Sequence, residues 1–333
     1  MVSTYAICGI GQAIVDCQAN VAFEFLESRD IDIGSMSLVD ENEAIRLRKS
    51  LDNVMMSAGG SCANSIVTAS ALGSKCCFIG KVSTDEAGIH FKNSLRDIGC
   101  TFSTPPASEG PSTGQCIVCI TPDGERTMKT YLGVSGFLYP CDLDEAAISG
   151  SQIRFITGYL WNCEFGKETA LRAIDIAKGN NRMVALSLSA VFVVERFRPN
   201  FIKTLPLIDI LFGNESELRS LFECDSVDMC MSKASEVCKI VCVTVGDQGV
   251  MVDGKGLLPI FIPAFPVNKV VDCTGSGDSW AGAFMHYYLL GSSILEAATF
   301  ANVAASMVIG HFGARPKSDF KSQMERYNST LLH

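Results

Sequence analysis

Short apolar runs alternate with helical stretches along most of the chain. Near-continuous apolar runs are typical of strands that are buried on both faces. The pattern predicts strands at Tyr5–Ile10, Cys76–Val82, Ile153–Thr157, Met183–Leu188, Ile208–Phe212 and Ile240–Val245, and helices at Ser61–Leu72, Asp85–Ile98, Lys167–Lys178, Glu215–Phe222 and Asp278–Leu290. Helices of this length between strands require parallel crossovers. We therefore expect a single α/β domain over residues 1–333, with a mostly parallel central sheet and helices on both faces.

Two segments, 13–37 and 112–133, interrupt this alternation. The first carries a short strand around Ile14–Ala19 and no clear helical crossover. The second has two β-rich arms on either side of Thr121-Pro122-Asp123-Gly124, a typical hairpin turn. Together they could form a small projecting sheet, either a lid or a solvent-facing decoration. A further hairpin around Gly249–Pro263 is expected to extend the main sheet at one edge.

The composition narrows the classes of partner. The 333 residues include 27 Lys+Arg and 36 Asp+Glu, a net charge of −9, and 47% are hydrophobic. Such a chain can bury a large core, which excludes disorder. The acidic balance argues against nucleic acid or an anionic membrane as the main partner. Phosphate ligands remain possible, because backbone amides bind anions without a net positive charge.

The number and spacing of the cysteines indicate whether the protein works in a reducing or an oxidising compartment. The chain has 15 cysteines without a framework of spacings, and its N-terminus lacks the pattern of a signal peptide. Free thiols in a reducing cytoplasm are the simplest interpretation. The one C-x-x-C, Cys116 to Cys119, lies in a predicted strand, where positions three apart face opposite sides and cannot share a metal ion. No apolar run is long enough to span a bilayer.

A glycine-rich string near the C-terminus carries the strongest chemical signal. Val270-Val271-Asp272-Cys273-Thr274-Gly275-Ser276-Gly277-Asp278 comes directly before a helical run. A helix N-terminus offers unpaired N–H groups, and glycines let an anion approach them. Asp278 is then either a helix-capping carboxylate or a catalytic base beside an anion hole made by Gly275, Ser276 and Gly277.

This string resembles the second signature of the PfkB carbohydrate kinase family, also called the ribokinase family, whose pattern is roughly D-T-x-G-A-G-D. Asp272, Thr274, Gly275, Gly277 and Asp278 match in place. The run Gly59-Gly60-Ser61-Cys62-Ala63-Asn64 is similar to the G-G-x-x-x-N region of the same kinases. The motifs occur in the expected order, and the resemblance extends from about Tyr5 to Lys317.

The resemblance implies a ribokinase-like fold and in-line transfer of the ATP γ-phosphoryl group to a primary hydroxyl. Asp278 would accept the hydroxyl proton, and the amides from Gly275 to Asp278 would hold the developing charge. The small sheet would act as a lid that excludes water.

The resemblance also implies where ATP and Mg²⁺ bind. Asn214-Glu215-Ser216-Glu217 matches the family's N-x-x-E motif, in which Asn214 and Glu217 help to position Mg²⁺ and phosphate, although the same residues would make a good helix start. Thr244, Gly246 and Gly249 match T-x-G-x-x-G at the nucleotide phosphates and ribose. Ala301, Asn302 and Ala305 lie on the helix that commonly borders the adenine, and Gly313 lies in the segment after it.

At the acceptor end, Asp16 matches the family's aspartate near the end of the first strand. A carboxylate accepts two hydrogen bonds at once and so suits vicinal hydroxyls. Gly59, Gly60 and Asn64 are expected to join it. A purine base would need an aromatic slot, for which we consider Tyr159 and Trp161, with Phe137 and Leu138 on the other side. Alternatively, Tyr159 and Trp161 pack under the lid.

One departure concerns a monovalent cation. Many relatives hold K⁺ with the residues at the Asp272 and Thr274 positions and with the segment after the last core helix. Lys317 stands where K⁺-dependent sugar kinases often place serine. An ammonium group there could occupy the cation's place or repel it, which makes K⁺ activation doubtful.

The sequence therefore predicts an ATP- and Mg²⁺-dependent small-molecule kinase of the adenosine-kinase-like branch, acting as a monomer or homodimer. Two groups of residues, Gly59–Ser65 and Thr113–Thr121, resemble adenosine kinases more than ribokinase. Adenosine is the favoured acceptor. The alternatives are a sugar kinase (for ribose, fructose or a 2-keto-3-deoxygluconate-like substrate) and an inactive kinase-like binding protein.

Overall fold

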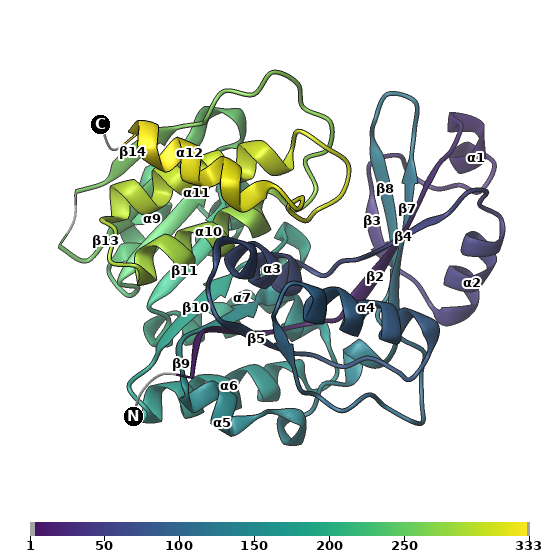
Figure 1. The fold of residues 1–333 in the computed structure, drawn as a ribbon, viewed down its shortest axis with the longest axis horizontal. Coiled ribbons are helices and arrows are strands. Elements are labelled where there is room, and N and C mark those ends of the chain that lie inside the picture. Colours follow the sequence, from purple (N-terminus) through teal and green to yellow (C-terminus); the bar gives the residue numbers. More distant parts are fainter. Residues whose placement is uncertain (1–3, 257, 332–333) are drawn as a thin grey trace.

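The computed structural model describes residues 4–256 and 258–331, which form a large α/β body with a small second sheet beside it (Figure 1). The larger sheet has nine strands in the order β14-β13-β12-β11-β10-β9-β1-β5-β6. Neighbours from β12 to β6 are parallel, and β13 and β14 are added antiparallel at one edge, as predicted for the hairpin around Gly249–Pro263. Its strands are β1 (Tyr5–Ile10), β5 (Cys76–Ile79), β6 (Thr101–Phe102), β9 (Ser151–Thr157), β10 (Met183–Ser187), β11 (Ile210–Asn214), β12 (Ile240–Thr244), β13 (Gly249–Gly254) and β14 (Ile260–Pro263).

Helices cover both faces of this sheet, and each face has its own hydrophobic core. One face packs against α3 (Ser61–Leu72), α4 (Glu86–Asp97), α10 (Ser276–Leu289), α11 (Ile294–Val308) and α12 (Phe320–Leu331). The other packs against α5 (Glu145–Ser149), α6 (Gly166–Gly179), α7 (Val191–Thr204), α8 (Glu215–Phe222) and α9 (Val227–Ser235). This confirms the predicted α/β class, a mostly parallel central sheet with helices on both faces.

The second sheet has five strands in the order β3-β8-β7-β2-β4. They are β2 (Ile14–Asn20), β3 (Met36–Leu38), β4 (Met55–Ala58), β7 (Gly114–Ile120) and β8 (Arg126–Tyr131), accompanied by α1 (Phe23–Glu27) and α2 (Glu41–Lys49). The sheet thus takes in β4, which lies beyond the two predicted segments, and α1 lies inside the segment for which no helical crossover was clear.

The two faces of the small sheet differ. Cys119 packs with Leu26 of α1 and Leu47 of α2, whereas Cys116 belongs to a separate apolar cluster on the opposite face. The C-x-x-C therefore faces two ways, as predicted. No group of three or more His, Cys, Asp or Glu side chains among the described residues could hold a metal ion.

Some predicted boundaries move. The strand predicted at Ile208–Phe212 begins two residues later, because α7 runs into a short 3-10 turn at Leu205–Leu207. The α7 helix itself was not predicted, since it contains Pro199, a residue that normally argues against a helix interior. Within the described chain, we find no helix of the length and apolarity needed to cross a membrane.

Candidate active site

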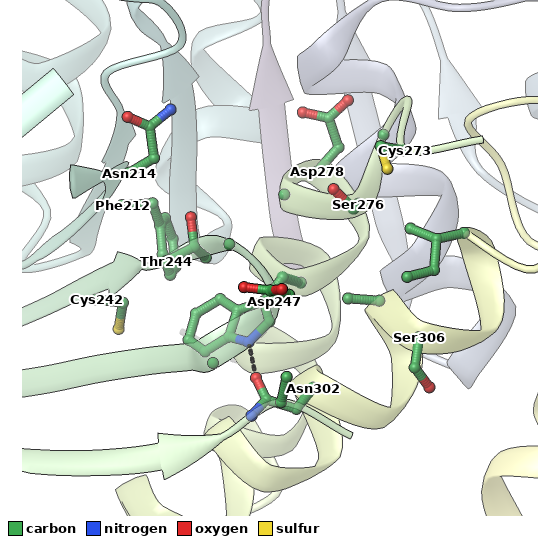
Figure 2. A pocket seen from close by; sticks show the side chains of 18 of the residues that line it. Phe212, Asn214, Cys242, Thr244, Asp247, Cys273, Ser276, Asp278, Asn302 and Ser306 are labelled. Carbon is green, nitrogen blue, oxygen red and sulfur yellow. Dashed lines mark hydrogen bonds between the residues drawn. The ribbon is translucent and has the colours of Figure 1, made fainter. Parts of the chain in front are cut away.

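A cavity of about 660 Å³ lies where the parallel strands end at one edge of the large sheet (Figure 2). Open parallel sheets bind ligands at this edge, because the loops after each strand meet there. Asn214 ends β11, Thr244 ends β12, and Asp278 enters from the first turn of α10. Figure 2 shows Asp278 and Asn214 toward one end of the cavity and Asn302 and Ser306 toward the other.

The glycine-rich loop forms the cavity wall at the start of α10. Gly275 has a φ of 75°, and a Cβ there would clash with Ala314. Only glycine suits this position. Ser276 begins the helix, and an added Cβ on Gly277 would meet no described atom within 4 Å. Ser276 N–H donates to the Cys273 carbonyl oxygen at 3.2 Å, so the candidate donors for an anion are the next two N–H groups, those of Gly277 and Asp278.

The Asp278 carboxylate lies at this wall with two hydrogen-bond donors. Ser61 Oγ donates to Oδ1 at 2.6 Å, and Asn64 Nδ2 donates to Oδ2 at 3.1 Å. Burial raises the pKa of Asp278, while these two hydrogen bonds and the charge of Arg315 oppose the rise. Ser61 was not singled out from the sequence, although it lies inside the G-G-x-x-x-N run.

Asp16 lies close to the same point. Its carboxylate rests against Gly59, where a Cβ would clash with it. Gly60 has a φ of 87°, and a Cβ there would meet the Gln12 carbonyl oxygen at 2.6 Å. Burial raises the pKa of Asp16 to about 7, although Arg315 and Arg126 oppose the rise. The structure therefore brings Asp16, Gly59, Gly60 and Asn64 together beside Asp278.

Asn214 and Glu217 line the cavity and also cap α8. Asn214 donates to the Glu217 carboxylate through its backbone N–H at 3.0 Å and through Nδ2 at 2.9 Å, and Glu217 N–H donates to Asn214 Oδ1 at 2.8 Å. Burial raises the pKa of Glu217 to about 7. Because each carboxylate oxygen already accepts a hydrogen bond, this donor set fits Mg²⁺ through bound water, the common mode for this ion.

Three further predicted nucleotide residues line the same cavity: Thr244, Gly246 and Gly249. Gly249 has a φ of 135°, and a Cβ there would clash with the Ile262 carbonyl oxygen. Of the α11 residues, Ala305 and Asn302 line the cavity. The Asn302 amide is fully used inside the protein, since it accepts from Trp280 Nε1 at 2.7 Å and donates to the Pro263 carbonyl at 2.7 Å.

The prediction for Ala301 is wrong, because Ala301 is fully buried in the hydrophobic core and does not line the cavity. It lies one residue from Asn302, so its side chain points to a different side of the helix.

The residues at the potential K⁺ position do not fit the ion. Asp272 accepts from Thr274 N–H at 2.9 Å and from Gly313 N–H at 2.7 Å, and it forms an ion pair with Arg126 of β8. The Asp272 side chain is completely buried in this arrangement. A guanidinium group therefore takes the place that a cation would need. Lys317 is exposed, so the buried partner of Asp272 is Arg126 rather than the ammonium group of Lys317.

The two residues considered for an aromatic slot lie in different surroundings. Tyr159 is partly exposed, and its ring lies 6.4 Å from that of Phe192, an exposed residue that the sequence did not single out. Trp161 instead lies in the core, with its ring 5.0 Å from Phe201, and Leu138 is also fully buried, so neither lines an acceptor slot. The cause is the tight turn at Gly158–Asn162, which directs side chains two residues apart to different sides.

Comparison with known proteins shows which family the chain belongs to. A family model described as pfkB family carbohydrate kinase matches residues 33–320. Adenosine kinase 2 from Arabidopsis thaliana is 28% identical over 94% of this chain and 97% of its own length.

Two solved structures superpose on nearly the whole chain. The adenosine kinase from Sinorhizobium meliloti has a TM-score of 0.92 and 32% identity, covering 98% of this chain and 100% of its own. A probable sugar kinase from Rhizobium etli has a TM-score of 0.93 and 29% identity, covering 98% and 99%. The chain belongs to the pfkB family of carbohydrate kinases and is an ATP-dependent enzyme that phosphorylates a small molecule carrying a primary hydroxyl, a nucleoside or a sugar.

Proposed function

We propose that the acceptor is adenosine and that its 5′-hydroxyl is the group phosphorylated. The observation that carries this proposal is the pair of aromatic rings of Tyr159 and Phe192 beside the acceptor end. Burial raises the pKa of the Tyr159 hydroxyl group, the carboxylates of Asp278 and Glu217 lie close enough to raise it further, and the Cys116 thiol of the small sheet also lies near it. A planar base can stack face to face on such rings, whereas a free sugar has no planar π-system and packs only its C–H groups against them.

The small sheet adds an apolar wall to the acceptor end. Ile14, Cys116 and Val118 form one cluster on the face that also carries Asp16. Asp16 offers acceptors for the vicinal hydroxyls of a ribose, and Asn64 Nδ2, which donates one hydrogen to Asp278, has a second hydrogen to offer. The polar end of the site can hydrogen-bond a ribose, and its apolar and aromatic walls can pack against a base. Such a site suits a nucleoside better than a sugar alone. The similarity to the S. meliloti adenosine kinase supports the same choice.

The geometry supports a simple reaction path. Asp278 accepts the proton of the attacking hydroxyl, because it lies at the start of α10 next to the anion site. The N–H groups of Gly277 and Asp278 hold the negative charge of the transferred phosphoryl group, whereas Ser276 N–H already donates to the Cys273 carbonyl oxygen. Mg²⁺, held through water by Asn214 and Glu217, would neutralise phosphate charge. The small sheet closes over the acceptor and excludes water, which would otherwise compete for the phosphoryl group.

The test is a coupled ADP-release assay with adenosine, other nucleosides, ribose, fructose and 2-keto-3-deoxygluconate. We expect adenosine to give the highest kcat/KM. Phe192→Ala should raise KM for adenosine about fivefold, since one aromatic contact is worth about 1 kcal/mol. Phe261→Ala is the matched control, because Phe261 is exposed on β14. Efficient phosphorylation of a free sugar with adenosine untouched would establish the sugar-kinase alternative instead.

A further inference from the structure

Arg315 follows Gly313 and Ala314 in the loop after α11, and its side chain joins three separate elements at the acceptor end. Nε donates to Asn64 Oδ1 of α3 at 3.0 Å, and one terminal nitrogen donates to the Gly59 carbonyl oxygen at 3.1 Å. The other terminal nitrogen donates to Ser94 Oγ of α4 at 3.0 Å, and the guanidinium lies 5.8 Å from the centre of the Phe91 ring. All three nitrogens are thus held in place.

The contact with Asn64 fixes which way the amide points. A carboxamide has one oxygen that accepts and one nitrogen that donates, whereas a guanidinium only donates. Because Oδ1 faces Arg315, Nδ2 must point away from it, and there it donates to Asp278 Oδ2 at 3.1 Å. If the Asn64 amide were flipped, Nδ2 would face the donor Nε of Arg315, and Oδ1 would face the acceptor Oδ2 of Asp278. Arg315 therefore determines that Asn64 presents a donor to Asp278.

The charge of Arg315 faces the same site. The three hydrogen bonds of Arg315 go to an amide oxygen, a hydroxyl oxygen and a carbonyl oxygen, and none goes to a carboxylate. Its positive charge is therefore not neutralised by a direct ion pair. Asp16 from β2 and Asp278 from α10 are the carboxylates that interact with it, and the Cys100 thiol lies on its other side. Arg126 and Asp272 also act on Asp16, with opposite signs. Burial lowers the pKa of Arg315 only to about 10, so it stays charged at neutral pH.

We propose that Arg315 is a positioning residue for phosphoryl transfer: it orients the Asn64 amide toward Asp278 and supplies the positive charge that faces both acceptor-end carboxylates. This inference rests on the proposed role of Asp278 as the base. Two expected effects of replacing Arg315 distinguish this positioning role from a purely structural one. Loss of the charge makes Asp278 and Asp16 harder to ionise, since both are opposed by burial. Loss of the hydrogen bonds alone leaves Asn64 free to turn.

The experiment compares wild type, Arg315→Met, Arg315→Lys and Ser94→Ala by kcat and acceptor KM between pH 5.5 and 9, with the best acceptor of the panel above. Arg315→Met should shift the acid limb of kcat to higher pH by about one unit, so that the loss of activity grows toward low pH, reaches about tenfold below the limb and is smallest at pH 9. Arg315→Lys keeps the charge and should keep the acid limb, with a lower kcat. Ser94→Ala removes one anchor without changing any charge and should leave the profile unchanged.

Two outcomes would overturn the inference. One is an acid limb in Arg315→Met that coincides with wild type, and the other is an equal loss of kcat at every pH. If Arg315→Met does not fold, an Arg315→Lys enzyme with wild-type kcat at all pH values would contradict the orienting role. Asp278→Asn is assayed alongside. An active Asp278→Asn enzyme would refute the base itself, whereas an inactive one beside an unaltered Arg315→Met would refute only the role of Arg315.

Discussion

Gly275 and Gly277 are two residues apart in the anion loop, and the structure assigns them different requirements. Gly275 needs its positive φ and its closeness to Ala314, whereas Gly277 is helical and faces open space. Gly277→Val should therefore fold normally, without backbone strain, and lose phosphoryl transfer by at least tenfold, because the side chain fills the space through which phosphate reaches the amides. Calorimetry and steady-state kinetics check this. Gly275→Val should instead lower the unfolding temperature. Normal turnover by Gly277→Val would remove the anion-site argument.

Asp278→Asn tests the base directly. Asparagine keeps the size of the side chain, and its single oxygen can accept from Asn64 Nδ2 while its own Nδ2 donates to Ser61 Oγ in place of the second carboxylate oxygen. It cannot take up a proton, so kcat should fall on the order of 10²–10⁴-fold. Isothermal titration should show ATP and acceptor binding close to wild type. Turnover within a factor of two of wild type would contradict the assignment.

Asp16 should make acceptor use depend on pH. Its pKa of about 7 means that the carboxylate, which accepts two hydroxyl hydrogen bonds, forms fully only above neutral pH. We expect the acceptor KM to fall as the pH rises from 6 to 8. Asp16→Ala should raise this KM strongly at all pH values, while the ATP KM stays unchanged. A loss of ATP affinity with unchanged acceptor affinity would show that Asp16 belongs to the nucleotide end.

At the scale of elements, the ion pair between Arg126 and Asp272 joins the β7–β8 hairpin of the small sheet to the anion loop. Removing one partner of a buried pair leaves the other charge uncompensated. Arg126→Met should therefore release the hairpin and speed cleavage by a Glu-specific protease at Glu125, which lies in the turn. Lys129→Met on the same strand is the control. Equal digestion of Arg126→Met and wild type would show that the pair does not hold the hairpin.

Helices and strands that are determined by their own residues could be predicted from the sequence. The buried strands of the large sheet are near-continuous apolar runs, and their order along the chain could be deduced from the helices between them. The β3 and β4 strands have only three and four residues and mixed polarity, so no period identifies them. The fates of Tyr159 and Trp161 could not be separated either, because a tight turn has no fixed inward and outward positions.

At the scale of the whole molecule, the contacts that complete the site join distant parts of the chain. Arg315 and Asn64 are separated by 251 residues, and Arg126 and Asp272 by 146. Neither pair leaves a signal in a local pattern, so the motifs predicted most of the site but not the arginines that connect it. The glycine-rich loop could be predicted because its spacing encodes the turn itself.

The site's carboxylates also set how the stability of the unliganded enzyme depends on pH. Asp16 and Glu217 have folded-state pKa values of about 7, above their ordinary values of 3.8 and 4.5. A group with a raised folded-state pKa binds its proton more tightly in the folded state. Its contribution to stability is therefore complete below the ordinary value and is lost as the pH rises toward 7. Burial lowers the pKa of His286 to about 4, so the folded state binds this proton more weakly than the unfolded state. Through this group, the stability of the folded state rises as the pH increases from about 4 to the ordinary value of 6.5.

Comparing variants isolates the site's share of this dependence. Asp16→Asn removes a carboxylate that is charged and desolvated at pH 8 but largely neutral at pH 5. It should therefore raise the unfolding temperature at pH 8, by roughly 2 °C or more, and change it little at pH 5, as calorimetry without ligands can show. Asp123→Asn is the control, because Asp123 is exposed in the hairpin turn and its pKa is lowered rather than raised. An equal effect of Asp16→Asn at both pH values would mean that Asp16 is not desolvated in the folded enzyme, and the pH dependence of acceptor binding argued above would lose its cause.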